Sequence, residues 1–285
     1  MKDRTNLYQL LELIERSDAI MIGAGAGLSS AAGLTYDGER FHQYFSDFIE
    51  RYHVRDMYSA GFYPYDTLEE FWAYWSRYIY VNRYVDPPKP TYALLKELVE
   101  HKPYFVLTTN VDHQFQRAGF DSAKLFYTQG DYGLWQCSIP CHDKVYENKD
   151  IVEKMVKQQK DFKVPTQLVP HCPVCGAAMS MNLRTDETFV EPAGWHKAME
   201  RYEAFVDGNK HKSILYLELG VGFHTPGIIK YPLWQYTLHN PLATYVCINP
   251  SEAMCPDEIR ERSLLIREDI HEVLTEVKKL RGKRV

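Results

Sequence analysis

The pattern of apolar and polar positions along the chain predicts an α/β protein. Apolar runs with the length of buried strands occur at residues 19–22, 104–107, 125–127, 213–219, 244–248 and 263–266. Between them, apolar residues recur at helical spacing over residues 5–16, 91–100, 193–206 and 269–280. Strands that alternate with helices are typical of a parallel sheet covered on both faces. We therefore expect a Rossmann-like, doubly wound core.

Two stretches interrupt this alternation, and we expect them to form a smaller lobe. The first, about 41–90, is rich in aromatic residues and has helical periodicity, which predicts a helical insertion. The second, about 131–181, contains four cysteines, and we expect its polar, helix-patterned stretch 143–163 to be an exposed excursion. The core of this single catalytic domain, which spans 1–285, then consists of residues about 1–40, 91–130 and 182–285.

Composition and charge exclude several classes of protein. Apolar residues make up 45% and charged residues 25% of the chain, as in ordinary globular proteins. The net charge of −5 argues against a nucleic-acid binder, which normally carries a basic face. No apolar run approaches the roughly 20 residues that span a bilayer, and the N-terminus does not resemble a signal peptide. We expect a cytoplasmic protein with no membrane partner.

Cysteine spacing is the clearest chemical signal. Cys137-x3-Cys141 is followed by Cys172-x2-Cys175, and two such close pairs are typical of a tetrahedral zinc site with four thiolate ligands. Because four protein ligands leave no coordination position for water, we expect one structural Zn²⁺. His142 and His171 are neighbours of these cysteines and could replace a ligand, but the four cysteines suffice.

The first apolar run leads into a glycine-rich turn. Gly23, Gly25 and Gly27 follow it, with Ser29 and Gly33 after them. Glycines between a strand and a helix let the backbone approach a phosphate, and the helix N-terminus favours its negative charge. The alternative is a tight turn made of small packing residues. The spacing differs from the dinucleotide fingerprint of dehydrogenases, which argues against hydride transfer.

Polar residues follow other predicted strands, where ligands bind in open α/β sheets. Asn110 and Asp112 follow residues 104–107, and Gln129 follows residues 125–127. The alternative for Asn110 and Asp112 is helix capping. The segment 34–41, which contains Asp37-Gly38, is either a flap over a cofactor or a plain surface loop.

Together these motifs resemble the sirtuin family over nearly the whole chain. Residues 25–34 are similar to the family's Gly-Ala-Gly-Ile-Ser…Ala-Gly-Ile, and residues 108–112 to its Thr-Gln-Asn-Ile-Asp. Residues 220–222 stand where the family has Gly-Thr-Ser, and Ile248-Asn249 matches its pair near the adenosine. The resemblance implies NAD as co-substrate. The residues implied to contact it are Gly25, Ala26, Gly27, Leu28, Ser29, Gly33, Arg184, Gly220, Val221, Gly222 and Asn249.

Two departures from the sirtuin pattern concern the chemistry. Residues 35–38, Thr-Tyr-Asp-Gly, replace Pro-Asp-Phe-Arg, and Gln129 replaces the histidine of the His-Gly pair. In a sirtuin deacylase that histidine takes a proton from the ribose hydroxyls. An amide cannot act as a general base at neutral pH. Breaking the glycosidic bond to nicotinamide needs mainly positioning and stabilisation of charge, and both can survive the replacement.

In these departures the chain resembles the macrodomain-linked sirtuins of microbes. Those enzymes are protein mono-ADP-ribosyltransferases that act on a lipoylated carrier similar to the glycine-cleavage H protein, with a macrodomain hydrolase as functional partner. The resemblance implies the same activity here, with Asn110, Asp112 and Gln129 as catalytic residues. Arg184 would steady the pyrophosphate or dock an acidic acceptor; its alternative is a surface salt bridge. Two other interpretations are an NAD-dependent lysine deacylase that tolerates Gln129 and a catalytically silent NAD or ADP-ribose sensor.

Overall fold

A six-stranded parallel sheet forms the centre of the larger lobe. The computed structural model describes residues 4–223 and 226–283, and its sheet has the order β3-β2-β1-β7-β8-β9. The strands are β1 (Ala19–Ala24), β2 (Tyr104–Thr108), β3 (Leu125–Tyr127), β7 (Ile214–Leu219), β8 (Thr244–Ile248) and β9 (Ser263–Ile266). The chain moves outward from β1 on one side and from β7 on the other, so the predicted doubly wound core is confirmed.

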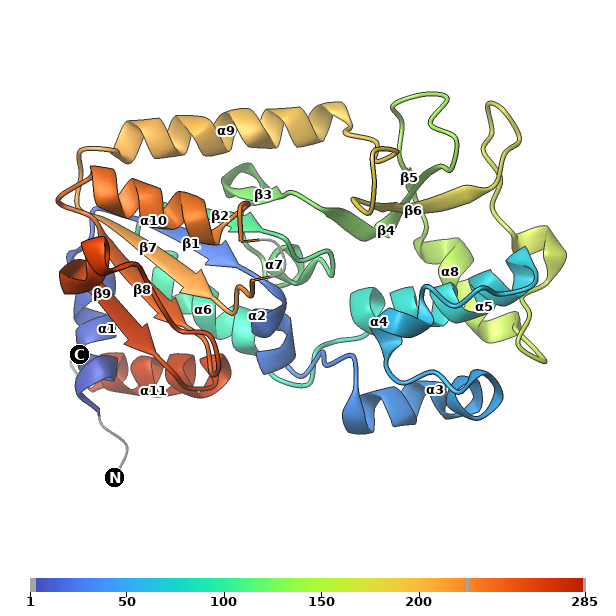
Figure 1. The fold of residues 1–285 in the computed structure, drawn as a ribbon, viewed down its shortest axis with the longest axis horizontal. Helices are drawn as coiled ribbons and strands as arrows, with labels where there is room; N and C mark the ends of the chain where they lie inside the picture. Colours follow the sequence, from blue (N-terminus) through green and yellow to red (C-terminus); the bar gives the residue numbers. More distant parts are fainter. Residues whose placement is uncertain (1–3, 224–225, 284–285) are drawn as a thin grey trace.

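Helices cover both faces of this sheet (Figure 1). One face carries α1 (Thr5–Arg16), α6 (Thr91–Val99) and α11 (Ile270–Gly282), and the other carries α9 (Ala193–Asn209) and α10 (Lys230–His239). Each face of the sheet has its own apolar core under these helices. Strand β1 contributes to both, because successive side chains point to opposite faces: Ile20 and Ile22 pack under α1, α6 and α11, and Met21 packs under α9 and α10. The remaining short elements are α2 (Ala26–Ala31), α7 (Gln114–Arg117), η2 (Ser122–Lys124) and η4 (Asp257–Arg262). No described helix is long and apolar enough to cross a bilayer.

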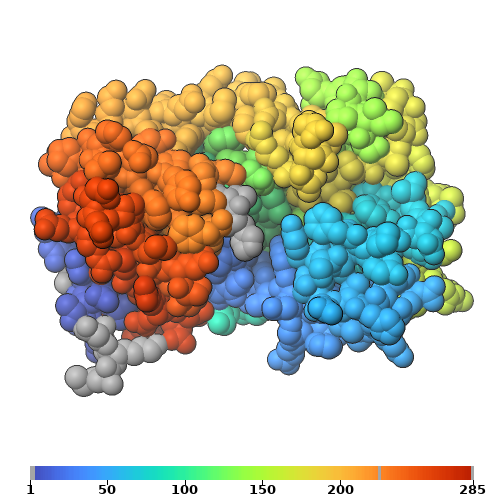
Figure 2. Space-filling model, viewed as in Figure 1, coloured from blue at the N-terminus to red at the C-terminus, as the bar shows by residue number. Residues whose placement is uncertain are grey.

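The smaller lobe lies beside this sheet and combines both insertions (Figure 2). Its antiparallel sheet has the order β5-β4-β6, with β4 (Gly130–Cys137), β5 (Tyr146–Glu147) and β6 (Met179–Leu183). Its helical elements are α3 (Gly38–Tyr52), α4 (Met57–Ala60), α5 (Leu68–Ile79), the π-helix η1 (Tyr80–Tyr84), α8 (Lys149–Gln158) and η3 (Thr166–Leu168). A single apolar core joins these elements.

The prediction that residues 143–163 form an exposed excursion is wrong. Helix α8 packs against α5, and its Val152 and Met155 are completely buried. They belong to the same apolar core as Trp72 and Trp135. Two apolar residues three positions apart share one helix face, so α8 can pack on a neighbour although most of its residues are polar. The lysine-rich composition concealed this narrow apolar face.

Candidate active site

Helix α2, which follows β1, and the loop that follows β2 line a cavity of about 430 Å³, which we call the first cavity. The residues predicted for the site that line it are Ala26, Ser29, Asn110 and Asp112. Residues 34–37 form another part of its wall, and the Tyr36 hydroxyl lies 2.9 Å from that of Tyr132, which also lines the cavity. The segment therefore faces the candidate site, as the flap interpretation requires. Residues 38–41 of this segment already belong to helix α3.

A second cavity, of about 630 Å³, is lined by two more of the residues with predicted roles. Gln129 and Arg184 line it together with Thr128 and Trp195. The Gln129 amide donates from Nε2 to Thr128 Oγ1 at 3.2 Å. Arg184 pairs with Glu191 at 3.2 Å and lies over the Trp195 ring, so the salt-bridge alternative and a position in the cavity both hold. The predicted catalytic residues are thus divided between two cavities.

The glycine turn is packed against the loop that follows β7. A Cβ atom at Gly27 would lie 2.7 Å from Gly220 Cα, and one at Gly25 would lie 2.7 Å from Gly220 O. The N–H groups of Gly25 and Gly27 donate to Leu219 O and Gly220 O at 3.0 and 2.9 Å. These two amides are therefore already used. The packing alternative explains both glycines, and any phosphate contact here has to use other groups of the turn.

Gly33, Gly220 and Asn249, three further residues with predicted contacts to NAD, line neither cavity. Gly33 has φ +91°, a conformation that favours glycine, and its Cα faces Pro88. Gly220 has φ +61° and approaches Gly27 backbone to backbone. After β8, Asn249 Oδ1 accepts the N–H groups of Ser251 and Glu252 at 3.1 Å each. Its Nδ2 donates to Val221 O at 3.4 Å, which joins the loops after β7 and β8.

Ser29, Asn110 and Asp112 are held by hydrogen bonds within the protein. Ser29 Oγ donates to Asp112 Oδ2 at 2.5 Å, and Asn110 Nδ2 donates to Gly25 O at 3.0 Å. The other Asp112 oxygen accepts the Gln114 N–H at 3.2 Å, so the capping alternative accounts for one of its two oxygens. Burial raises the pKa of Asp112, and the hydrogen bonds from Ser29 and Gln114 oppose that rise.

Sequence reasoning missed an ionic group behind the loop that carries Asn110 and Asp112. Asp131 is 3% exposed; one of its carboxylate oxygens contacts His113 Nδ1, and the other lies 2.7 Å from Arg83 Nε. Burial alone would raise the pKa of Asp131, but His113 and Arg83 outweigh it and hold the pKa below its usual value. The only feature of the sequence that pointed to Asp131 is its position, two residues after Gln129. Arg83, in the π-helix, gave none.

A tyrosine was missed as well. The Tyr92 hydroxyl, from α6, lies 2.8 Å from Ser29 Oγ and 3.2 Å from Asn110 Nδ2. Burial raises the pKa of Tyr92 well above its usual value, so the phenol stays protonated. An apolar-patterned helix with one aromatic residue gave no reason to select this side chain.

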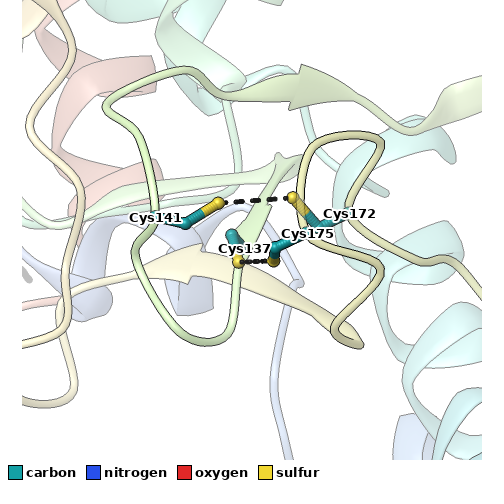
Figure 3. A group of neighbouring side chains, drawn as sticks. All are labelled: Cys137, Cys141, Cys172 and Cys175. Carbon is teal, nitrogen blue, oxygen red and sulfur yellow. Dashed lines mark hydrogen bonds between the residues drawn. The ribbon is translucent and has the colours of Figure 1, made fainter.

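The four predicted zinc ligands lie together (Figure 3). The sulfur atoms of Cys137, Cys141, Cys172 and Cys175 are all within 4.8 Å of one another. The Cys137–Cys175 and Cys141–Cys172 sulfur pairs are 3.5 and 3.7 Å apart. Four sulfurs at about 2.3 Å from a tetrahedral Zn²⁺ would be about 3.8 Å from one another. The arrangement therefore fits one structural zinc.

The two neighbouring histidines are outside this ligand set. His142 Nδ1 lies 3.0 Å from Cys141 Sγ, and its Nε2 lies 2.9 Å from the Tyr146 hydroxyl. A ring between a ligand sulfur and a tyrosine supports the ligand from outside. His171 instead bonds Val169 O at 2.9 Å.

Comparison with known proteins gives a relative with high coverage, whereas no family model matches. A protein ADP-ribosyltransferase of Staphylococcus aureus (strain Mu50 / ATCC 700699) is 41% identical over 277 residues, which are 96% of this chain and 88% of the relative. The chain belongs to the protein ADP-ribosyltransferase family. A probable bifunctional ADP-ribose hydrolase/ADP-ribosyltransferase of Fusarium oxysporum f. sp. cubense is 29% identical over 233 residues, 78% of this chain and 38% of that protein.

Solved structures show which fold this ADP-ribosyltransferase has. Sir2Tm bound to a propionylated peptide matches with a TM-score of 0.58 and 20% identity over 99% of both chains. A complex of Sir2 with a p53 peptide and NAD⁺ matches with a TM-score of 0.55 and 19% identity, over 97% of this chain and 98% of that one. The predicted sirtuin fold is confirmed. The chain is therefore a sirtuin-type, NAD-dependent protein ADP-ribosyltransferase.

Proposed function

We propose that this protein transfers one ADP-ribosyl unit from NAD to a nucleophile on a lipoylated carrier protein and releases nicotinamide. The observation that carries the proposal is the combination of Gln129 with an intact, hydrogen-bonded Ser29–Asn110–Asp112 group. Gln129 Nε2 donates to Thr128 Oγ1, and Oε1 is the atom of this amide that accepts from a hydroxyl. The amide can orient a ribose but cannot deprotonate it.

The first cavity is our proposed place for the nicotinamide end of NAD. Asn110 and Asp112 hold the carboxamide and the adjoining ribose there. The turn from Gly25 to Ser29, with Gly33, runs along the dinucleotide, and Gly220, Val221, Gly222 and Asn249 face its adenosine end. Arg184 steadies the pyrophosphate or an acidic acceptor. The zinc holds the smaller lobe and takes no part in the reaction, because its four thiolates leave no open position.

The reaction needs little proton transfer from the protein. The glycosidic bond breaks, and nicotinamide leaves with the bonding electron pair. Positive charge develops on the ribose, and fixed dipoles and the Asp112 carboxylate stabilise it. The acceptor nucleophile then forms a bond to the anomeric carbon from the side of the second cavity, where Gln129 orients the ribose, and the proton that the nucleophile carried passes to water.

The acceptor is proposed to be a lipoylated carrier similar to the glycine-cleavage H protein, with a macrodomain hydrolase that reverses the modification. Support for the hydrolase comes from the Fusarium relative, whose name joins ADP-ribose hydrolase and ADP-ribosyltransferase in one protein. We place the activity in the cytoplasm, where a reducing environment keeps the cysteine ligands as thiolates.

Intact-mass measurement of the lipoylated carrier after incubation with enzyme and NAD tests the proposal. We expect a gain of one ADP-ribosyl unit, lost with Gln129→Ala. A matched control is Gln235→Ala, which changes an exposed glutamine of α10 outside both cavities and should keep the activity. The unlipoylated carrier shows whether the lipoyl group is needed.

The other outcomes separate the competing functions. Release of nicotinamide coupled to loss of an acyl group from a peptide would identify a lysine deacylase. Tight NAD binding by calorimetry, with no nicotinamide released in the presence of either substrate, would identify a sensor. Either result would overturn the proposed transfer.

A further inference from the structure

Tyr92 lies at the centre of the hydrogen bonds beside the first cavity. It is the second residue of α6 and only 3% exposed. Its ring packs edge-on against Phe115, with centroids 4.9 Å apart, which fixes the direction of its hydroxyl. That hydroxyl contacts both Ser29, in helix α2 after β1, and Asn110, in the loop after β2.

The donors and acceptors of this group allow one arrangement of protons. Gly25 O can only accept, so the Asn110 atom 3.0 Å from it is Nδ2, and the same nitrogen donates to the Tyr92 oxygen. Ser29 has a single hydroxyl proton, which it donates to Asp112 Oδ2. The Tyr92 proton is therefore the one donated to Ser29. The bonds run in one direction, from Asn110 through Tyr92 and Ser29 to Asp112.

The opposite direction fails at Tyr92. If a protonated Asp112 donated to Ser29, Ser29 would donate to the Tyr92 oxygen, which also accepts from Asn110. The Tyr92 proton would then have no acceptor among the described residues, and a buried hydroxyl without an acceptor is destabilising. The satisfied arrangement therefore keeps Asp112 ionised, although burial favours its neutral form.

We propose that Tyr92 is a positioning residue, which fixes the Asn110 amide with Oδ1 available to the first cavity and favours the charged form of Asp112. Asn110 lines that cavity, and its Oδ1 has no hydrogen bond within the described residues. An acceptor at this position selects a ligand group with an O–H or N–H, such as a ribose hydroxyl. The identity of that ligand rests on the proposed function.

Steady-state kinetics of Tyr92→Phe test the proposal, because the change removes one hydroxyl and keeps the ring on Phe115. We expect kcat for nicotinamide release to fall about tenfold, the effect of one hydrogen bond, while the KM for NAD stays within about twofold. In an Asn110→Ala background the same change should lower kcat by clearly less than about tenfold, because the part of its effect that passes through the Asn110 amide is already lost while the bond to Ser29 remains. Tyr104→Phe is the matched control, a buried tyrosine of the same apolar core outside both cavities, and should leave kcat unchanged.

An unchanged kcat in Tyr92→Phe, or an equal loss in Tyr104→Phe, would overturn the proposal. A measurement that needs no catalysis separates it from the proposed function. The unfolding equilibrium constant is measured in urea for Tyr92→Phe, Ser29→Ala and the double variant. If the two hydroxyls are coupled, the change in the double variant should differ at least about threefold from the product of the two single changes. Additive effects would contradict the hydrogen-bond chain even if transfer is observed. Coupling without any nicotinamide release would contradict only the proposed function.

Discussion

The candidate site residues of the two cavities differ in how deeply they are buried. In the first, Ser29 and Asp112 are 7% and 5% exposed, and each has a hydrogen bond within the protein. In the second, the Arg184 side chain is 43% exposed and its partner Glu191 29% exposed. Buried, fixed groups can stabilise developing charge without reorganising. Exposed groups can adjust to a large acceptor. On the proposed function, the contrast gives a rigid side for the NAD donor and an adaptable side for the acceptor.

The cavities also rest on different parts of the fold. The first lies at the carboxyl ends of β1 and β2 in the parallel sheet. The second depends on the smaller lobe, because Gln129 immediately precedes β4 and Arg184 follows β6. These two strands pair through Gly130 and Leu183 at this end and through Cys137 and Met179 near the cysteine cluster. Zinc at that cluster would therefore stabilise the second cavity from the far end of the same strands.

Loss of the metal is the largest expected effect. Cys172→Ser should release zinc and unfold the smaller lobe, because the energy of ligation is also folding energy, on the order of 10 kcal/mol for structural zinc sites. Metal content should fall from one zinc per chain to none. Hydrogen exchange should show β4 and β6 losing protection while β1 and β2 keep theirs. Cys255→Ser, outside the cluster, is the control; a soluble, fully metallated Cys172→Ser would show that the ligands are wrong.

Asn110→Ala should damage catalysis on the rigid side with little loss of stability. Removing a fixed polar group that acts on the transition state typically lowers kcat by about 10²–10³. Asn110 is only partly buried, and Ser29 still bonds Asp112 when the amide is absent. Nicotinamide release should therefore fall about a hundredfold or more, with NAD binding by calorimetry largely kept. A normal release rate would remove Asn110 from the site.

The sequence predicted what depends on nearby positions in the chain. The strands, the glycine turn and Asn110-x-Asp112 are local patterns, and the parallel sheet brings the ends of its strands together. The cysteine pairs were equally readable, because metal geometry fixes their spacing.

Contacts between segments far apart in the chain were not predictable from these patterns. Tyr92 reaches Ser29 across 63 positions, and Arg83 reaches Asp131 across 48. Tyr92 lies in a helix and Arg83 in an insertion. The apolar pattern of each segment is explained by packing, so it gives no reason to expect a polar contact. The packing of α8 on α5 was missed for the same reason, because only the partner helix shows which face is covered.

Asp131→Asn should have an intermediate effect, on stability. The change leaves Arg83 and His113 without their buried carboxylate, and breaking a buried pair costs about 3 kcal/mol. The pKa of Asp131 is lower in the folded protein than in the unfolded chain, where it is about 3.9. The carboxylate therefore contributes its full stabilisation of the fold above pH about 3.9, and this contribution is lost as the pH falls through the pKa of the folded protein. Urea unfolding at pH 7 should therefore show a large difference between variant and parent, which shrinks in acid. Asp207→Asn, at an exposed pair with Lys210, should change stability by less than about 1 kcal/mol at either pH.

Arg184→Ala should have the smallest effect and tests the adaptable side directly. Its salt bridge with Glu191 is largely solvated, so the free energy of unfolding should change by less than about 1 kcal/mol. If Arg184 docks an acidic acceptor, the KM for the carrier should rise several-fold, by about 1 kcal/mol of binding, while the KM for NAD stays constant. A rise in the KM for NAD alone would instead assign Arg184 to the pyrophosphate.

Glu191→Gln frees the guanidinium without removing it, so on the acceptor interpretation it should leave the carrier KM unchanged or lower it. A higher carrier KM in both variants would mean that the intact Arg184–Glu191 pair, held over the Trp195 ring, forms the acceptor contact.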